Sequence, residues 1–371
     1  MDNKISIVLI SYNDQRNIEN AINSVIKQTL KEIELICIDD ASGDETPAII
    51  QKYCLLDKRI KFYPQKENRG ALYSRYLGTT HVTSKYVMFL DSDDTLTNEA
   101  CQTAYDEITN KDSDLLLFGC NPYIADEVEN KEEYKNAINF VNSIFNNDEL
   151  PIFKSKNELL NYSFKEEKLP WTFWSKIYDI DLIKKAFKHY NKEKISFAED
   201  VYFSFLVLYY CKTIYKINNK LYNYQIGSGK STSEQRKIIN EDNDINYVSD
   251  SYLSYLLIKE HFYLENINIK NIAESLNVVE EKAIKMIMNY FYLECTPLCV
   301  SNLYKTINKY ISKDRLDNYL CTYGKEYYYV NKTKVLENIN GCIFVDKKIK
   351  RQLNNIDKPL YKLVDKIKRH L

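Results

Sequence analysis

The first third of the chain alternates continuous apolar runs with helical patterns, and this alternation restricts the fold more than any other feature. Ile5–Ser11 reads ISIVLIS, an unbroken apolar strand of the kind found where helices cover both faces of a parallel sheet. The same strand pattern returns at residues 33–38, 59–64, 86–90 and 114–120. Helical patterns fill the gaps, over residues 17–28 and from near Asp44 and Gly70. This order predicts an α/β fold with a doubly wound sheet.

Polar residues follow three of these strands. They are the triplet at residues 11–13, the pair Asp39 and Asp40, and Asp91-Ser92-Asp93. Ligands of doubly wound sheets bind beyond the carboxyl ends of the strands. We therefore expect the three polar groups to converge on one crevice.

The strand at residues 86–90 runs directly into three carboxylates, Asp91, Asp93 and Asp94. Like charges at this spacing repel one another, so a compensating cation is expected. Carboxylate oxygens suit Mg²⁺ or Mn²⁺, which keep some waters and bridge substrate phosphates. A glycine-rich phosphate loop is not available, because the first glycine of the chain is Gly43.

Charge and cysteine content exclude several classes of protein. The 51 basic and 52 acidic residues give a formal net charge of -1, which does not favour nucleic acid as a partner. The nine cysteines contain no CxxC pair and are typical of thiols in a reducing cytoplasm. The N-terminus lacks the basic region of a signal peptide. The best internal apolar run, Val201–Cys211, is about half the length that a spanning helix needs.

The stretch FLDSDDTL resembles the first motif of haloacid-dehalogenase-type phosphatases, in which the first aspartate, here Asp91, is the nucleophile. That motif normally lies on the first strand of its domain, whereas three predicted strands precede it here. A phosphatase is therefore an alternative with weaker support from motif position.

A wider set of motifs, SIVLISYN, SVIKQTLKEIELICIDDASGDET, ENRGALYSRYLGT and KYVMFLDSDD, resembles the family 2 glycosyltransferases of the GT-A fold. WSKIYDIDLI, FAEDVYF and YNYQIGSGKSTS resemble the acceptor half of bacterial polysaccharide-type members. The resemblance implies a GT-A domain over residues 1–233, with a nucleotide-sugar half at 1–120 and an acceptor half at 121–233. Residues 234–371 are predicted to form a helical C-terminal extension.

The resemblance implies donor-binding roles for five residues. Tyr12 would lie against the nucleobase of a UDP-sugar, and Asp40 would accept a hydrogen bond from the base. Arg75 would contact the donor. Asp91 and Asp93, as the DxD motif, would contact the ribose and the Mn²⁺ or Mg²⁺ on the diphosphate. A surface tyrosine remains the alternative for Tyr12.

Four neighbouring residues receive other predictions. Asp39 is expected to be structural and to bind backbone amides, and Asp94 to be a carboxylate at a helix N-terminus. Trp171 and Trp174 suit either stacking on sugar faces or packing in the core.

The resemblance also implies the catalytic pair Glu199 and Asp200. Inverting transfer needs a base that takes the proton of the acceptor hydroxyl as it attacks C1. Asp200 would be that base, and Glu199 would bind the acceptor or orient the loop. The acceptor would be a growing bacterial surface glycan such as a capsule or lipooligosaccharide, free or lipid-linked. The alternatives are an acidic first turn of a helix, and a non-catalytic glycan-binding protein that would tolerate loss of Asp200.

The C-terminal stretch 346–371 carries nine Lys or Arg residues against three Asp, with apolar residues at spacings of three and four. This pattern suits a helix that lies on anionic lipid at the inner membrane. Packing on the protein's own domain and a homodimer seam are the alternatives. The sequence thus predicts a cytoplasmic protein with an optional peripheral membrane contact.

Overall fold

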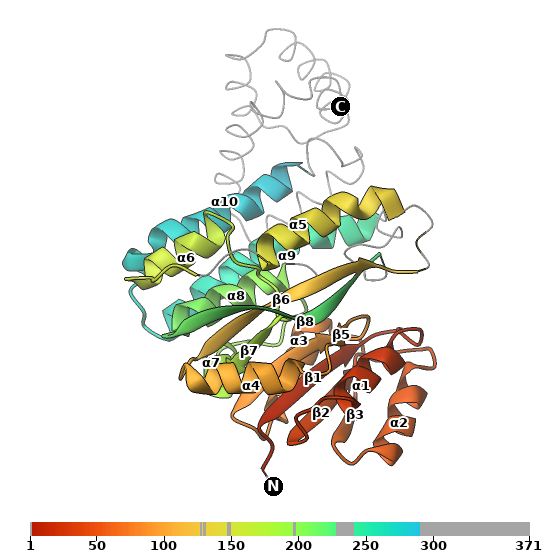
Figure 1. Cartoon of the computed structure of the whole chain (residues 1–371). Helices are drawn as coiled ribbons and strands as arrows, with labels where there is room; N and C mark the ends of the chain where they lie inside the picture. Colours follow the sequence, from red (N-terminus) through yellow and green to blue (C-terminus); the bar gives the residue numbers. More distant parts are fainter. Residues whose placement is uncertain are drawn as a thin grey trace, which may run out of the picture. The chain divides into compact units, whose positions relative to one another are not determined.

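The computed structural model describes residues 2–126, 128, 131–146, 150–195, 198–227 and 241–289 (Figure 1). The chain divides into two compact units. The first comprises Met1–Ile238 and Glu260–Ser275, and the second comprises Ile239–Lys259 and Leu276–Leu371. The predicted membrane-binding or dimer helix at 346–371 lies outside the described residues.

One sheet organises the described part of the first unit, with the strand order β3-β2-β1-β4-β7-β6-β8-β5. Its strands are β1 (Ile5–Ser11), β2 (Ile33–Asp39), β3 (Ile60–Pro64), β4 (Tyr86–Asp91), β5 (Thr95–Leu96), β6 (Leu115–Ile124), β7 (Lys176–Asp179) and β8 (Ile214–Ile226). β1 pairs in parallel with β2 and β4, and β2 pairs in parallel with β3. β7 runs antiparallel to both β4 and β6. The predicted doubly wound α/β sheet is confirmed, with a mixed half added beyond β4.

The α-helices of the described residues follow the strands in the predicted alternation through the first third. They are α1 (Ile18–Ile26), α2 (Thr46–Leu56), α3 (Ala71–Thr80), α4 (Ala100–Asn110), α5 (Lys135–Phe145), α6 (Lys156–Phe164), α7 (Ile180–Ala186), α8 (Glu199–Tyr210), α9 (Glu241–Leu264) and α10 (Ala273–Asn289). Short 3-10 helices cover Lys131–Tyr134 and Ile269–Ile272.

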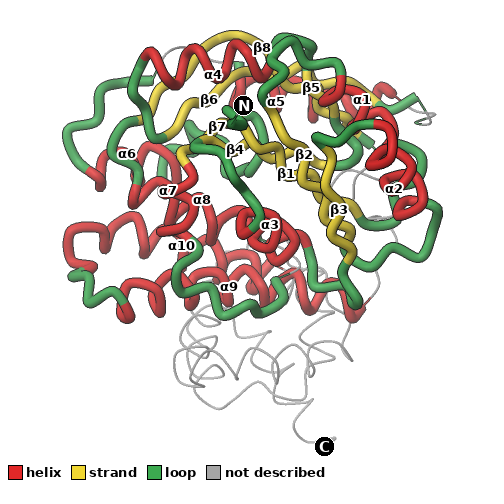
Figure 2. The backbone as a smooth tube through the Cα atoms, turned by 90° about the horizontal axis from the view of Figure 1, so that it is seen from below, coloured by secondary structure: helices red, strands yellow, loops and turns green. Residues whose placement is uncertain are grey.

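Helices cover both faces of the parallel half of the sheet, as the apolar character of β1 requires (Figure 2). Alternate β1 residues Ile5, Ile7 and Leu9 share one core cluster with α1. Val8 points to the other face, where α3 packs so closely that a Cβ on Gly78 would lie 2.3 Å from a methyl group of Val8. Only glycine fits this contact, which fixes α3 against the sheet.

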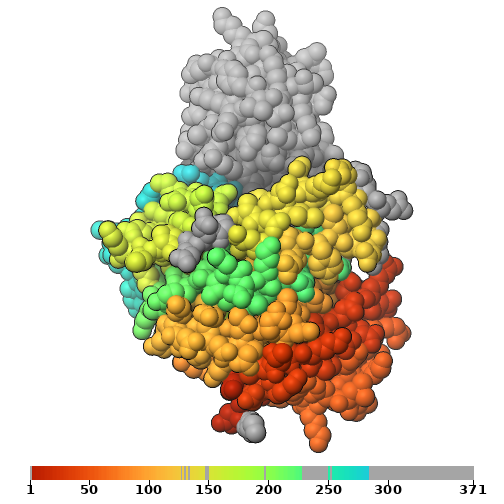
Figure 3. All heavy atoms as spheres, in the orientation of Figure 1, coloured from red at the N-terminus to blue at the C-terminus, as the bar shows by residue number. Residues whose placement is uncertain are grey.

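Both the early and the later elements of the first unit contribute to its surface. In Figure 3 the atoms of the first strands and helices, coloured red to orange, lie beside those of the later elements, coloured yellow to green. Across the described residues, every helix is too short or too polar to cross a lipid bilayer.

Candidate active site

The register of the sheet brings the predicted polar groups to one edge. Ser11 is opposite Asp39 where β1 and β2 end, and Ile10 of β1 is opposite Asp91 of β4. The loops after these three strands therefore lie together at the carboxyl edge of the sheet, the region that we call the crevice. The predicted convergence is confirmed.

Asp39 ties the loops after β1 and β2 together. Its carboxylate accepts hydrogen bonds from Ser11 Oγ at 3.0 Å, from Ser42 Oγ at 2.5 Å and from the Ser42 amide at 2.9 Å. Asn13 completes the connection, because its amide donates to Ser42 Oγ and its side-chain oxygen accepts from the Gly43 amide, both at 2.8 Å. The structural role predicted for Asp39 is confirmed.

Tyr12 follows β1 directly, between Ser11 and Asn13, and 38% of its surface is exposed. An aromatic ring exposed at the mouth of the crevice could stack on a planar base. Its contact with the nucleobase stays a prediction.

Asp40 is 4% exposed, and its carboxylate receives three donors from the segment that leads into α3. The amides of Arg69 and Gly70 donate to it at 2.7 and 2.8 Å, and Gln65 Nε2 donates at 3.1 Å. Gly70 has a φ of 84°, a conformation that glycine adopts without strain. Asp40 thus fixes the start of the helix that carries Arg75, and its contact with the base stays a prediction.

The acidic turn after β4 has two buried anchors. Ser92 Oγ donates to Asp14 of the β1–α1 loop at 2.6 Å. Asp94, which is 1% exposed, accepts from the Tyr222 hydroxyl and from the Gln225 amide of β8, both at 2.7 Å. Burial, together with the neighbouring aspartates, raises the pKa of Asp94 well above its usual range.

The prediction that Asp94 is a helix N-terminal carboxylate is wrong. The nearest helix, α4, begins only at Ala100, and the Asp94 carboxylate turns inward to β8. The donors of β8 stabilise it there, which the local sequence pattern did not indicate. Asp91 and Asp93 remain half-buried at the crevice.

Arg75 connects the end of β4, where Asp91 lies, to the start of α8, where Glu199 and Asp200 lie. The guanidinium, 5% exposed, donates from Nη2 to Asp91 Oδ1 at 2.8 Å and lies 3.7 Å from Glu199 Oε1 through Nη1. Its carbon atom Cζ is 4.4 Å from the centroid of the Phe173 ring. Burial lowers the pKa of Arg75, but Asp91, Asp200 and Glu199 outweigh it and raise the pKa above its ordinary value.

Glu199 and Asp200 begin α8 and face the same region. The preceding residue, Ala198, has a φ of 58°, so the chain turns sharply into the helix. Burial is the largest cause that raises the pKa of each carboxyl above its usual range, and Arg75 opposes the rise in both. Asp200 Oδ1 is buried and makes no hydrogen bond among the described residues. Such a carboxyl is suited to exchanging a proton near neutral pH.

Four non-glycine residues around this crevice have positive φ, as do others elsewhere in the described chain, such as Asp112, Glu167 and Asn266. Asn13, Ala41, Ser175 and Ala198 have φ values of 51°, 61°, 61° and 58°. Positive φ costs energy in residues other than glycine and gathers at functional sites. The four residues lie in the loops after β1 and β2, beside β7 and before α8, the elements that form the site.

Asp91 and Asp93 are the residues that could hold a metal ion. Within the described ranges, no three His, Cys, Asp or Glu side chains are arranged to enclose an ion on their own. Two carboxylates nevertheless fit Mg²⁺ or Mn²⁺, since these ions commonly use one or two carboxylates and complete their shell with waters and phosphate oxygens.

Residues that the sequence analysis did not single out also build the site. Asp14 and Tyr222 fix the acidic turn, and Phe173 packs on Arg75. Lys176 lies on β7, 5% exposed, close enough to Asp200 to affect its pKa. Lys176 is the first residue of the short strand KIYD, so the local sequence contains no signal that it is buried.

The two tryptophans pack in the interior. The Trp174 ring stacks on Phe145 and on Tyr222, with centroids 4.5 and 4.8 Å apart. Trp171 stacks on Phe164 at 5.2 Å, and its indole nitrogen donates to the Ser163 carbonyl at 3.3 Å. Of the two alternatives for these residues, core packing is the one these contacts favour.

Comparison with known proteins identifies related sequences and folds. The family model of glycosyl transferase family 2 matches residues 6–168. Glycosyltransferase GlyA of Streptococcus pneumoniae is 26% identical over 236 residues, which are 62% of this chain and 31% of GlyA. Cholesterol galactosyltransferase of Borreliella burgdorferi is 26% identical over 232 residues, 62% of each chain. This chain therefore spans less than two thirds of the length of either relative.

The fold is similar to that of S. aureus TarS. The crystal structure of TarS residues 1–349 in complex with UDP-GlcNAc aligns with a TM-score of 0.57 and 19% identity. The alignment covers 95% of this chain and 91% of that one.

Proposed function

Because residues 6–168 place this chain among the family 2 glycosyltransferases, with the GT-A fold, we propose that it transfers a sugar from a nucleoside-diphosphate sugar to a hydroxyl group of a bacterial surface glycan. UDP is the nucleotide we favour, since the structurally similar TarS fragment was crystallised with UDP-GlcNAc. A capsule or lipooligosaccharide, free or lipid-linked, is the acceptor class that we propose.

One observation carries the proposal. Arg75 bridges Asp91, at the end of the donor-side strand β4, and Glu199, at the start of α8. The bridge brings the predicted donor site and the predicted base, Asp200, into one crevice. A glycan-binding protein without catalysis would have no need to bury this charged arrangement, which is costly unless it is paired.

The proposed reaction is a single displacement with inversion. The acceptor oxygen forms a bond to C1 of the donor sugar as the bond from C1 to the diphosphate oxygen breaks. Asp200 takes the proton of the acceptor hydroxyl, and the diphosphate leaves with the bonding electron pair. Glu199, held by Arg75, orients the acceptor or the start of α8.

Positive charge near the leaving group lowers the barrier further. Arg75 contributes one cation beside Asp91. A Mn²⁺ or Mg²⁺ ion held by Asp91 and Asp93 would neutralise charge on the departing diphosphate. The phosphatase alternative, with Asp91 as nucleophile, loses support, because Arg75 engages one Asp91 oxygen at 2.8 Å. In addition, the family model that matches this region is that of glycosyl transferase family 2.

Screening nucleotide sugars for thermal stabilisation and for hydrolysis, with and without Mn²⁺, tests the proposal. We expect a UDP-sugar to stabilise the protein only when the metal is present. In calorimetry, Asp93→Ala should lose most metal-dependent UDP binding, whereas Asp106→Ala, an exposed carboxylate on α4, should bind as the wild type does. Unchanged metal-dependent binding by Asp93→Ala would contradict the assignment of Asp93.

We also propose a cytoplasmic location. The cysteines that the structure describes, Cys37, Cys54, Cys101, Cys120 and Cys211, are free thiols. Free thiols are typical of a reducing compartment.

Peripheral membrane contact or dimerisation through residues 346–371 is a separate proposal, and co-sedimentation of the whole chain with anionic vesicles at low salt tests the membrane contact.

A further inference from the structure

Three consecutive backbone carbonyls beside the active site are each held by a side chain. The segment is Trp171–Phe173, which leads into β7, and the donors come from β7 and α8. Ser204 Oγ donates to the Trp171 carbonyl at 2.9 Å, Lys176 Nζ to the Thr172 carbonyl, and the Tyr178 hydroxyl to the Phe173 carbonyl at 2.8 Å. We call these three donors the carbonyl clamp.

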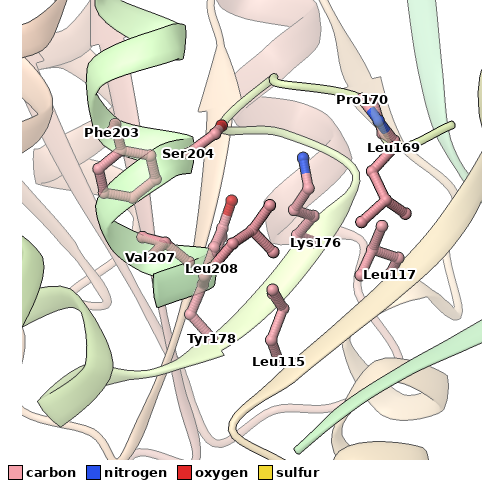
Figure 4. Close-up of a pocket in the computed structure, with 10 residues that line it drawn as sticks. All are labelled: Leu115, Leu117, Leu169, Pro170, Lys176, Tyr178, Phe203, Ser204, Val207 and Leu208. Atoms are coloured by element: carbon pink, nitrogen blue, oxygen red, sulfur yellow. The ribbon is translucent and has the colours of Figure 1, made fainter. Parts of the chain in front are cut away.

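Lys176 is the unusual member of the clamp. Its side chain reaches into a cavity of about 10 Å³ whose walls are mainly apolar, with Leu115, Leu117, Leu169 and Val207 among them (Figure 4). Besides the Thr172 carbonyl, its amine donates to Thr172 Oγ1 at 3.2 Å. Burial lowers the pKa of Lys176 to about 7.

Placing an amine in such surroundings costs free energy that an apolar side chain of similar size would not. Packing alone therefore gives no reason for a lysine at this position. Among the described residues, its side chain hydrogen-bonds only to Thr172, so the segment that contains Thr172 is the place to look for its role.

Through Phe173, its last residue, the clamped segment contacts Arg75, which bridges Asp91 and Glu199. The Phe173 ring stacks on Phe203 of α8, with centroids 3.7 Å apart, and packs edge-on against Phe89 of β4 at 5.2 Å. Its face supports the Arg75 guanidinium, 4.4 Å away. A guanidinium over an aromatic face is held both by packing and by attraction to the ring.

We propose that Lys176 is a positioning residue of the active site: by holding the Thr172 carbonyl it fixes Phe173 beneath Arg75, so that Arg75 can bridge Asp91 and Glu199. The inference rests on the proposed glycosyl transfer. It adds a role for the acceptor-half motif WSKIYDIDLI, whose lysine hydrogen-bonds to Thr172.

The positive charge of Lys176 supports the proposed catalysis in a second way. Burial raises the pKa of Asp200, and the positive charges of Arg75 and Lys176 oppose that rise. The protonated lysine thus helps to keep the proposed base ionised while the clamp keeps the arginine in place.

Lys176→Met tests the proposal. Methionine keeps the length of the side chain and suits an apolar cavity, so the fold should be retained. We expect kcat to fall about tenfold to hundredfold, the scale set by a misplaced catalytic group. The KM for the nucleotide sugar should change by less than about threefold, since the groups that bind the donor remain.

Lys156→Met is the matched control. Lys156 also donates to a backbone carbonyl, that of Cys211 at 2.5 Å, but it is exposed, and Cys211 lies at the opposite end of α8 from Glu199 and Asp200. Thermal unfolding of both variants measures any loss of stability, and Lys156→Met should keep the wild-type kcat.

Tyr178→Phe provides a second, independent variant. It removes the hydroxyl that holds the Phe173 carbonyl and keeps the ring, so kcat should again fall while the donor KM holds. This variant decides the question if Lys176→Met does not fold.

Wild-type kcat in Lys176→Met, or in Tyr178→Phe if the first variant does not fold, would overturn the inference. The same holds if kcat falls equally in Lys156→Met. If the wild-type protein transfers no sugar from any nucleotide sugar, the proposed function itself fails, and the inference fails with it. Sugar transfer by the wild type with unchanged variants contradicts the inference alone.

Discussion

Two pairs of adjacent acidic residues meet at the crevice, and their environments differ. Asp39 and Asp40 follow β2, are 1% and 4% exposed, and accept hydrogen bonds from hydroxyl, amide and backbone donors of the neighbouring loops. Glu199 and Asp200 begin α8, and the described residues supply them with fewer hydrogen-bond donors than the first pair has. The described contact of Glu199 is a 3.7 Å ion pair with Arg75, and Asp200 Oδ1 makes no hydrogen bond among the described residues.

The difference separates carboxylates that build the site from carboxylates that can react. A buried carboxylate with several donors is stabilised in its charged form and holds backbone in place. A buried carboxyl with few donors has a raised pKa, as Glu199 and Asp200 do, and can take up a proton near neutral pH. Under the proposed function, the predicted donor half would thus act as a scaffold, and the predicted acceptor half would carry the proton chemistry.

Among the variants that test this contrast, Asp200→Asn is expected to have the largest effect on the rate of transfer. The amide keeps the shape of the side chain but cannot act as a base, so transfer should fall about a hundredfold to ten-thousandfold. The Kd for the nucleotide sugar, measured by calorimetry, should change little. Near-wild-type transfer would mean that the base lies elsewhere.

Arg75→Lys is expected to have the next largest effect. Lysine keeps one positive charge but has no planar fork to reach Asp91 and Glu199 together. We expect kcat/KM to fall about tenfold to hundredfold, the range for a misplaced catalytic group. Arg16→Lys, in the β1–α1 loop, is the control. Equal rates for the two variants would show that the bridge does not matter.

Asp40→Ala should have the smallest effect on transfer and act mainly on stability. The amides of Arg69 and Gly70 would lose their buried acceptor, which costs about 1–3 kcal/mol in unfolding free energy. Denaturant unfolding measures this, with Asp126→Ala, whose side chain is fully exposed, expected to change it by less than about 0.5 kcal/mol. A loss of UDP affinity at unchanged stability would instead favour the base-contact role predicted for Asp40.

The sequence predicted the donor half better than the acceptor half. β1 has the bounds that its apolar run indicated, and β2 and β4 each end one residue later than predicted. These strands are buried on both faces, so their residues form mainly apolar runs that are easy to recognise. β7 and β8 were not predicted, because β7 has only four residues and the polar segment KINNK interrupts β8.

The same limit applies to the site. The strand-end carboxylates were predicted from local pattern, since each follows an apolar run directly. The inward turn of Asp94 depends on Tyr222, and the position of Arg75 depends on Phe173, partners that lie about a hundred residues or more away along the chain. Contacts made across the sheet leave no periodic trace in the sequence.

The pH dependence of kcat, compared in the wild type and in Asp200→Asn, tests the central claim most directly. A base must be unprotonated to act, so the rate should fall as the pH drops through the pKa of Asp200. Because burial raises that pKa, the fall should begin above the pH at which an ordinary aspartate titrates. The account predicts that Asp200→Asn, with its low residual rate, loses this acidic fall. An acidic fall at the same pH in both proteins would contradict it.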